Sequence, residues 1–294
     1  MALEKLKNRY NKMRKAYCSE TSFLNSVNKY KDDMKNFNVW WLGQSGFLIQ
    51  WQGKHLLMDP YLSDSLTKKY AKTDKPHKRI TERVVNPLKM DFINVVTASH
   101  GHTDHLDPET LLPLVKSNNN MDLIVPAAEI ELAVDRSSLS EDKIKSINAG
   151  EVIESNGFKI HAIPSAHEKI KKDENGNHYY LGYIVEFGPW AIYHSGDTVE
   201  YDKMEKYLTQ WNLDVVFLPI NGRKSERRVP GNMWGTESAS LAKRVNARAV
   251  IPHHFNMFTF NTESPNDFIT EANNLGQLFF VLENGEHWSS DQLK

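Results

Sequence analysis

Apolar residues recur along the chain in short runs, and these runs alternate with segments that carry helix signals. β-branched and aromatic runs at 38–42, 46–51, 55–58, 92–99, 159–164, 181–187, 190–194, 215–220, 249–252 and 278–282 predict strands. Helices are predicted near 107–115, 127–134, 199–209, 237–245 and 265–274. Tight turns are expected at Gly53 and at 188–190. This order indicates a mixed α/β protein.

The first 36 residues differ from the rest, because their apolar positions are scattered among many charges. They predict one or two helices, and we interpret them as an N-terminal helical extension. The remaining residues, 37–294, carry all the candidate chemistry and are interpreted as one domain. With 294 residues, of which 40% are hydrophobic, the chain is long enough to bury a large core.

The strand predicted at 92–99 is followed by the most informative segment of the chain, SHGHTDHLDP at 99–108. His100 and His102 can point the same way from extended backbone, since side chains at i and i+2 share a face. Asp104 and His105 lie where the chain turns, so they can address a second ion. Asp107 is expected to cap the following helix, with Pro108 in its first position. Imidazole and carboxylate groups suit Zn, Mn or Fe.

One loop cannot supply every ligand for two metal ions, and three other predicted strands end in ligand-type side chains. These strands lead to His167, to Asp197 and to the adjacent pair His253 and His254. A carboxylate such as Asp197 can bridge two cations. The two neighbouring histidines compete for one role, because successive strand residues face opposite ways. We expect His161 and His194 within strands or behind the ligands, and His178 in solvent.

The H-x-H-x-D-H cluster in this strand-to-helix context resembles the metallo-β-lactamase superfamily, over roughly Asn38 to Trp288. The resemblance implies a four-layer αβ/βα sandwich, an α/β fold that some schemes class as α+β. It further implies two divalent metal ions per chain, Mn or Zn. The residues implied to hold one ion are His100, His102 and His167, those for the other are Asp104, His105 and His254, and Asp197 bridges the two.

A closer resemblance is to the bacterial L-ascorbate-6-phosphate lactonase branch. The segments that carry it are WWLGQSGF (40–47), MDPYLSD (58–64), YHSGDT (193–198), LPINGR (218–223), GNMWGTESASLA (231–242) and IPHHFNMFTFNTESP (251–265). Relatives often read P-x-H-[YF/H]-[DN] in the last segment, which selects His254 over His253. A more distant resemblance is to phospholipase D-type enzymes that cleave N-acyl-phosphatidylethanolamine.

The substrate side is less well specified by the sequence. The loop NGRKSERR at 221–228 follows a predicted strand, and Arg223 could grip a phosphate in a bidentate way. A solvated basic loop is an equal alternative. Asn221 is a possible substrate contact, while Asp59 and His253 are expected to support the ligands without binding metal. Trp234 and Phe258 could form pocket walls or pack in the core, and the loop 169–178 could act as a lid.

Composition narrows the possible partners. A net charge of −1 does not indicate a nucleic-acid binder. No run approaches the roughly 18 apolar residues of a membrane span, and the N-terminus is too charged for a secretory signal. The single cysteine, Cys18, fits a reducing compartment, so we expect a cytoplasmic protein that can form homo-oligomers.

The function expected from these features is hydrolysis of an ester-like bond by a water acidified between two cations. Asp104 would hold the nucleophile and return a proton to the leaving group. The preferred substrate is a phosphorylated sugar-acid lactone such as L-ascorbate 6-phosphate. A phosphodiesterase of the phospholipase D type and a non-hydrolytic metal or ligand sensor are the alternatives.

Overall fold

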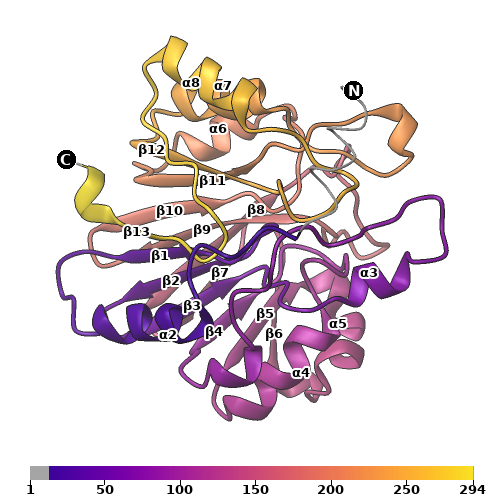
Figure 1. Ribbon diagram of the computed structural model, residues 1–294, viewed down its shortest axis with the longest axis vertical. Coiled ribbons are helices and arrows are strands. Elements are labelled where there is room, and N and C mark those ends of the chain that lie inside the picture. The colour runs from indigo at the N-terminus through magenta and orange to yellow at the C-terminus, as the bar shows by residue number, and fades with distance from the viewer. Residues whose placement is uncertain (1–12, 294) are drawn as a thin grey trace.

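The computed structural model describes residues 13–293, which form two β-sheets packed face to face with helices on both outer faces (Figure 1). Helices α2, α4 and α5 cover one sheet, and α6, α7 and α8 cover the other. The layers follow the order helix, sheet, sheet, helix. The predicted four-layer αβ/βα sandwich is therefore confirmed.

The first sheet has seven strands in the order β13-β1-β2-β3-β4-β5-β6. The pairs from β13 to β3 are antiparallel, and the pairs from β3 to β6 are parallel. The strands are β1 Asn38–Trp41, β2 Phe47–Trp51, β3 Lys54–Met58, β4 Val95–Thr97, β5 Asp122–Pro126, β6 Ile144–Ile147 and β13 His287–Ser289.

The second sheet has six strands in the order β12-β11-β10-β9-β8-β7. Its strands β10, β11 and β12 are parallel, and β7 to β10 pair antiparallel, so β8 runs in the same direction as β10. The strands are β7 Val152–Ser155, β8 Phe158–Pro164, β9 Leu181–Phe187, β10 Trp190–His194, β11 Val215–Pro219 and β12 Ala249–His253.

Two helix ends carry clear sequence signals. The Asp107 side chain accepts a hydrogen bond from the Glu109 backbone N–H at 3.3 Å, which confirms the predicted cap of α4. Gly276 ends α8 in the left-handed conformation that glycine favours. The α-helices are α2 Glu20–Lys29, α3 Ser65–Lys69, α4 Pro108–Ser117, α5 Ile130–Ser137, α6 Met204–Leu208, α7 Gly235–Arg244 and α8 Asn266–Leu275; 3₁₀ turns lie at Pro87–Lys89, Ala127–Glu129, Glu141–Lys143, Ser225–Arg227 and Ser290–Leu293.

Alternating side chains on each strand divide the core into layers. On β2, Phe47 and Ile49 face the second sheet, whereas Leu48 lies in the cluster beneath the helices of the first sheet. The Phe47 ring meets Phe217 of β11 at a centroid distance of 4.4 Å. Period-two alternation therefore stacks the two sheets against each other and leaves the opposite face for helices.

Several predicted elements differ from the structure. The strand predicted at 278–282 is wrong, because in the described residues this segment makes only an isolated bridge between Phe279 and Val250. The strand β13 at His287–Ser289 pairs with β1 instead. The helix predicted at 199–209 is reduced to Met204–Leu208. Strands β5, β6 and β7 were not among the predictions.

Helix α2, within the predicted N-terminal extension, packs onto the first sheet. Helix α2 starts after Ser19, whose side chain accepts the Ser22 backbone N–H at 3.2 Å. Phe23 and Val27 are buried in the same cluster as Trp40. The extension was predicted to hold one or two helices, and its first 12 residues lie outside the described residues. Among the described residues, we find no helix with the length and apolar character needed to cross a membrane.

Candidate metal centre

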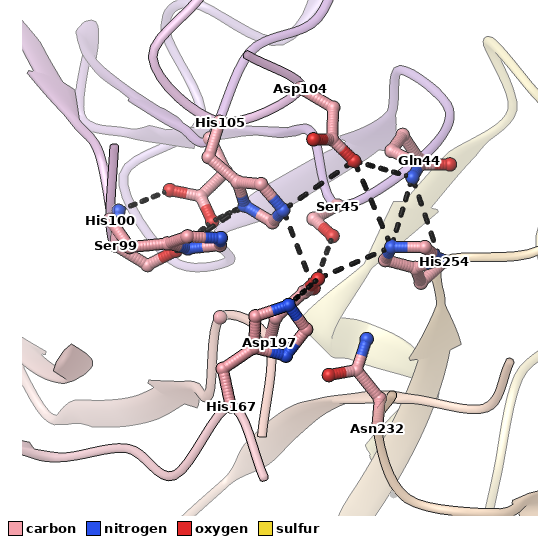
Figure 2. A network of polar contacts seen from close by, with 12 residues as sticks. Gln44, Ser45, Ser99, His100, Asp104, His105, His167, Asp197, Asn232 and His254 are labelled. Atoms are coloured by element: carbon pink, nitrogen blue, oxygen red, sulfur yellow. Dashed lines mark hydrogen bonds and ion pairs between the residues drawn. The ribbon is translucent and has the colours of Figure 1, made fainter. Parts of the chain in front are cut away.

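Five ligand-type side chains lie just beyond the carboxyl ends of strands from both sheets. Asp59 follows β3, His100 follows β4, His167 follows β8, Asp197 follows β10 and His254 follows β12. The parallel strands of each sheet end at a common edge, and the two edges meet. The fold therefore brings together residues that are far apart in the sequence (Figure 2).

Asp197 lies at the centre of this cluster. Its carboxylate oxygens are 3.4 Å from His105 Nε2, 3.3 Å from His254 Nε2 and 3.8 Å from His167 Nε2. Asp104 Oδ2 lies 3.7 Å from His105 Nε2 and 3.8 Å from His254 Nε2. These nitrogens and oxygens point toward one another from different strands (Figure 2).

The ligand atoms fall into three overlapping groups, and within each group all atoms lie within 4.8 Å of one another. The groups are His100, His102 and His167; His100, His105 and Asp197; and Asp104, His105 and His254. His100 Nε2 and His105 Nε2 are buried and have no hydrogen-bond partner among residues 13–293. A buried nitrogen without a partner is unfavourable, and a cation would satisfy both lone pairs. The donor set therefore fits divalent metal ions.

Asp59 holds the metal loop from behind. Its Oδ2 accepts hydrogen bonds from His105 Nδ1 and from Ser99 Oγ, both at 2.6 Å, and its Oδ1 accepts the Ser99 backbone N–H at 2.7 Å. Asp59 is fully buried. Because Nδ1 of His105 donates to this carboxylate, Nε2 is the nitrogen left to face the cluster. This is the supporting geometry expected for Asp59.

Charges within the cluster shift the pKa values of its members in opposite directions. Burial would lower the pKa of His105, but Asp197 and Asp59 outweigh it and raise that pKa well above its usual value. Burial would raise the pKa of Asp197, but His254 and His105 hold it well below its usual range. Burial lowers the pKa of His167 to about 4. Burial would lower the pKa of His254 too, but Asp197 raises it above its usual value. A cation bound here would therefore compete with protons on His105 and His254.

His253 and His254 diverge at the end of β12. His254 turns into the left-handed region, with φ of 61°, and its Nε2 reaches Asp197 and Asp104. The His253 ring instead stacks on His194 at a centroid distance of 5.1 Å, and neither of its nitrogens has a hydrogen-bond partner in the described part of the chain. His194 Nε2 in turn donates to the Ser45 carbonyl at 2.8 Å. The structure thus brings His254, and not His253, to the cluster.

A cavity of about 260 Å³ opens above the cluster. Two cationic side chains, Lys69 and Arg136, contribute to its walls. Lys69 Nζ donates to Thr103 Oγ1 at 3.3 Å, and Arg136 Nη1 donates to the Gly101 carbonyl at 2.7 Å. The other lining residues are Leu66, Tyr70, His77, Gly101, His102, Thr103, Asp104, His167, Asp197, Val229, Pro230, His254 and Asn261.

Comparison with known proteins identifies the family. The sequence profile of the beta-lactamase superfamily domain matches residues 38–254, which include strands β1 to β12 and every residue of the cluster. The chain belongs to this superfamily. A "UPF0173 metal-dependent hydrolase" of Caldivirga maquilingensis is 26% identical over 234 residues, which are 79% of this chain and 88% of that protein.

Solved structures share the fold. Igni18, a metallo hydrolase from Ignicoccus hospitalis, superposes with a TM-score of 0.63 and 21% identity, over 87% of this chain and 98% of that one. An isothiocyanate hydrolase from Delia radicum gut bacteria superposes with a TM-score of 0.68 and 15% identity, over 85% of this chain and 98% of that one. At these identities, the likeness concerns the superfamily fold alone.

Within this superfamily fold, the substrate residues predicted from sequence do not line the cavity. The Arg223 guanidinium pairs with Glu237 of α7 at 2.6 and 2.7 Å, and Arg223 is not among the cavity residues. Asn221 is fully buried, and its Nδ2 donates to Asn261 Oδ1 at 3.1 Å. Asn261 lines the cavity, so Asn221 contacts a cavity residue without lining the cavity itself.

Other expectations near the site are also resolved. Phe258 packs in a small buried cluster with Tyr61, Leu66 and Met257, so it belongs to the core. Neither Trp234 nor the loop 169–178 contributes to the cavity wall. His178 was expected in solvent, which is wrong: it is 8% exposed, and its Nδ1 contacts Asn148 Oδ1 at 2.8 Å.

Three residues of the site were not predicted. Gln44 contacts Asp104 and His254, and Lys69 and Arg136 line the cavity. Gln44 lies within WWLGQSGF, but a single glutamine in a turn has no ligand spacing that marks it. Lys69 and Arg136 stand at or near helix ends, where basic residues are common for other reasons.

Proposed function

We propose that the protein is a metal-dependent hydrolase that cleaves an ester-like bond in a small anionic molecule, preferably a phosphorylated sugar-acid lactone. The observation that carries this proposal is the His and Asp cluster at one end of a cavity whose walls include two cationic side chains. A cavity of about 260 Å³ suits a small molecule.

The seven proposed ligands are His100, His102, Asp104, His105, His167, Asp197 and His254, with Mn or Zn as the proposed ions. Two divalent cations held there would acidify a water and polarise the bond under attack. Asp104 would accept the proton of the nucleophile, because its carboxylate is ionised: burial raises its pKa, but His105 and other nearby histidines lower it below the usual value. Returning that proton to the leaving group completes hydrolysis.

Lys69 and Arg136 support an anionic substrate. Arg223 stays paired with Glu237, whereas Lys69 lines the cavity. Lys69 contacts Thr103, which lies between the ligands His102 and Asp104 in the sequence. The contact between Lys69 and Thr103 is a long one, at 3.3 Å, so the ammonium can exchange it for a phosphate oxygen. We therefore assign the phosphate contact proposed for this enzyme to Lys69, with Arg136 as the second cation.

Metal content tests the first part of this proposal. Protein prepared without chelator and then saturated with Zn²⁺ or Mn²⁺ should retain more than one transition metal per chain by elemental analysis. Asp104→Ala should abolish turnover while the chain stays folded. A wild-type protein that retains no metal at saturation would end the metalloenzyme proposal.

The substrate class is tested by assaying the metal-loaded protein on lactones, phosphorylated lactones and phosphodiesters. Lys69→Met should lower kcat/KM about ten- to a hundredfold on a phosphorylated lactone and little on its unphosphorylated analogue, since a charge-assisted hydrogen bond is worth roughly 1.5–3 kcal/mol. Arg223→Met is the matched control and should change neither value. Turnover of phosphodiesters but not lactones would select the phosphodiesterase, and no turnover of any substrate by metal-loaded protein would favour a sensor.

A further inference from the structure

Gln44 joins two of the proposed ligands through both its side chain and its backbone. Its Nε2 donates to Asp104 Oδ2 at 2.8 Å and lies 3.0 Å from His254 Nε2. Its carbonyl accepts the His254 backbone N–H at 2.9 Å and the Trp41 indole N–H at 3.1 Å. Figure 2 shows the amide between Asp104 and His254.

The position of Gln44 makes these contacts a bridge between the two sheets. Gln44 lies in the turn between β1 and β2, and Asp104 lies in the loop after β4, so both belong to the first sheet. His254 follows β12 in the second sheet. Gln44 therefore connects ligands that the two halves of the sandwich supply separately.

The backbone at this contact is strained on both sides. Gln44 has φ of 51° and His254 has φ of 61°, both in the left-handed region that residues other than glycine rarely adopt. Each such residue is unfavourable unless its surroundings hold it in place. The backbone hydrogen bond between the two residues helps to hold both in place, and strain of this kind concentrates at functional sites.

Asp104 depends on Gln44 for its orientation. Among the described residues, Gln44 Nε2 is the donor within hydrogen-bond distance of the Asp104 carboxylate. His105 and His254 lie 3.7 and 3.8 Å from the same oxygen, which is too far for a hydrogen bond. Gln44 is only 2% exposed, so water cannot readily replace its amide.

We propose that Gln44 is a positioning residue for the cation site formed by Asp104, His105 and His254. This inference rests on the proposed function only in requiring that a cation binds there. The amide donates to one oxygen of Asp104, which restricts the rotation of the carboxylate. The Gln44 carbonyl fixes the backbone from which His254 reaches the same site. Gln44 thus holds a ligand from each sheet near the separation that a shared cation needs.

Two substitutions of similar length separate this role from a structural one. Gln44→Met removes the donor, and Gln44→Glu replaces it with an acceptor that can carry negative charge. Gln277→Met is the control, because Gln277 is also buried, at 6% exposed, and its Nε2 donates to the Ala247 carbonyl at 3.1 Å, away from the cluster. The readouts are Zn²⁺ affinity and stoichiometry by chelator competition, and urea unfolding of the metal-free protein.

Gln44→Met should weaken one of the two Zn²⁺ sites about ten- to a hundredfold, the usual effect of losing a partner that orients a ligand. Gln277→Met should leave the affinity within twofold. Gln44→Glu should make the metal-free protein less stable than Gln44→Met does, since a further carboxylate would face Asp104, yet it should bind Zn²⁺ more tightly than Gln44→Met. Opposite changes in stability and affinity would not arise from a merely structural role.

The inference is overturned if Gln44→Met binds both cations as tightly as the wild type, or if the two Gln44 variants lose affinity equally. Either result leaves the proposed function intact, because the wild type still binds metal. A wild type that binds no Zn²⁺ defeats the proposed function and this inference together.

Discussion

Replacing Asp59 with asparagine removes the charge that orients His105 while almost preserving side-chain shape. The Asp59 carboxylate accepts three hydrogen bonds at 2.6–2.7 Å, two from Ser99 and one from His105 Nδ1. An asparagine has one acceptor oxygen, so whichever way its amide turns, its NH₂ group faces at least one donor. One buried charge-assisted bond is therefore lost in either orientation.

The magnitude follows from that geometry. A hydrogen bond to a charged group contributes about 1.5–3 kcal/mol, so we expect Asp59→Asn to lower the free energy of unfolding by about 2–3 kcal/mol. The cation affinity should also fall, by about ten- to a hundredfold, because His105 loses the anionic partner that fixes its ring and tautomer. Chelator competition with Zn²⁺ measures the affinity, and urea unfolding measures the stability.

Asp214→Asn is the matched control. Asp214 is 6% exposed and accepts hydrogen bonds from the Ala191 backbone at 2.9 Å and from Arg248 Nη1 at 2.6 Å. It precedes β11, at the opposite end of that strand from the cluster. The control should lose stability and keep its Zn²⁺ affinity. If both variants lose affinity equally, or if Asp59→Asn binds Zn²⁺ within twofold of the wild type, the reasoning about Asp59 is refuted.

Three further predictions test other parts of the structure. His254→Ala should lower Zn²⁺ occupancy, whereas His253→Ala should lower only stability; elemental analysis of the two variants distinguishes them, and the reverse pattern would move the ligand by one position. Burial lowers the pKa of His55 to about 4 from 6.5, so the neutral His55 side chain contributes stability above pH 6.5 that is lost as the pH falls toward 4. This one group should account for about 2 kcal/mol of the stability lost between pH 7 and pH 5, so His55→Gln should lose about that much less than the wild type in urea unfolding, and equal pH dependence in both proteins would contradict it. Gly196 has φ of 57°, and an added Cβ would lie 2.5 Å from Ser99 Cβ. Gly196→Ala should therefore destabilise the protein and weaken Zn²⁺ binding by displacing Asp197. Unchanged Zn²⁺ affinity would show instead that the adjoining loop adapts.

Local sequence signals are sufficient to predict much of the fold and of the candidate site of this protein. The loop 99–108 places four ligand-type side chains within six residues, so their proximity needs no knowledge of distant contacts. Asp107 followed by Pro108 marks a helix start for local reasons, because a cap bonds to the N–H groups directly after it. The apolar strands before His167, Asp197 and His254 could also be predicted from the sequence. Strands that run in a common direction end at a common edge of the sheet, so the residues that follow them are expected to lie together.

The elements that were missed or misplaced have weak local patterns. Strand β7 has only one buried residue, Ser155, so it shows no apolar alternation. The segment 278–282 is apolar, but it lies beside β12 and forms only a single bridge with it. Whether such a segment pairs as a strand depends on its spatial neighbour, which its own sequence does not specify. A short apolar run specifies burial more reliably than it specifies hydrogen bonding to a neighbour.

Only the tertiary structure decided which polar residues complete the site. Among the four basic residues of 221–228 the sequence favoured Arg223 as a phosphate contact, but Arg223 pairs with Glu237 at the start of α7 and is held there. Lys69 and Arg136 come from separate helices and reach the cavity through packing. Gln44 lies 60 residues from Asp104 and 210 residues from His254 along the chain. A ligand loop is set by bonds between neighbours in the sequence, whereas the partners that orient it are set by the stacking of two sheets, which no local pattern encodes.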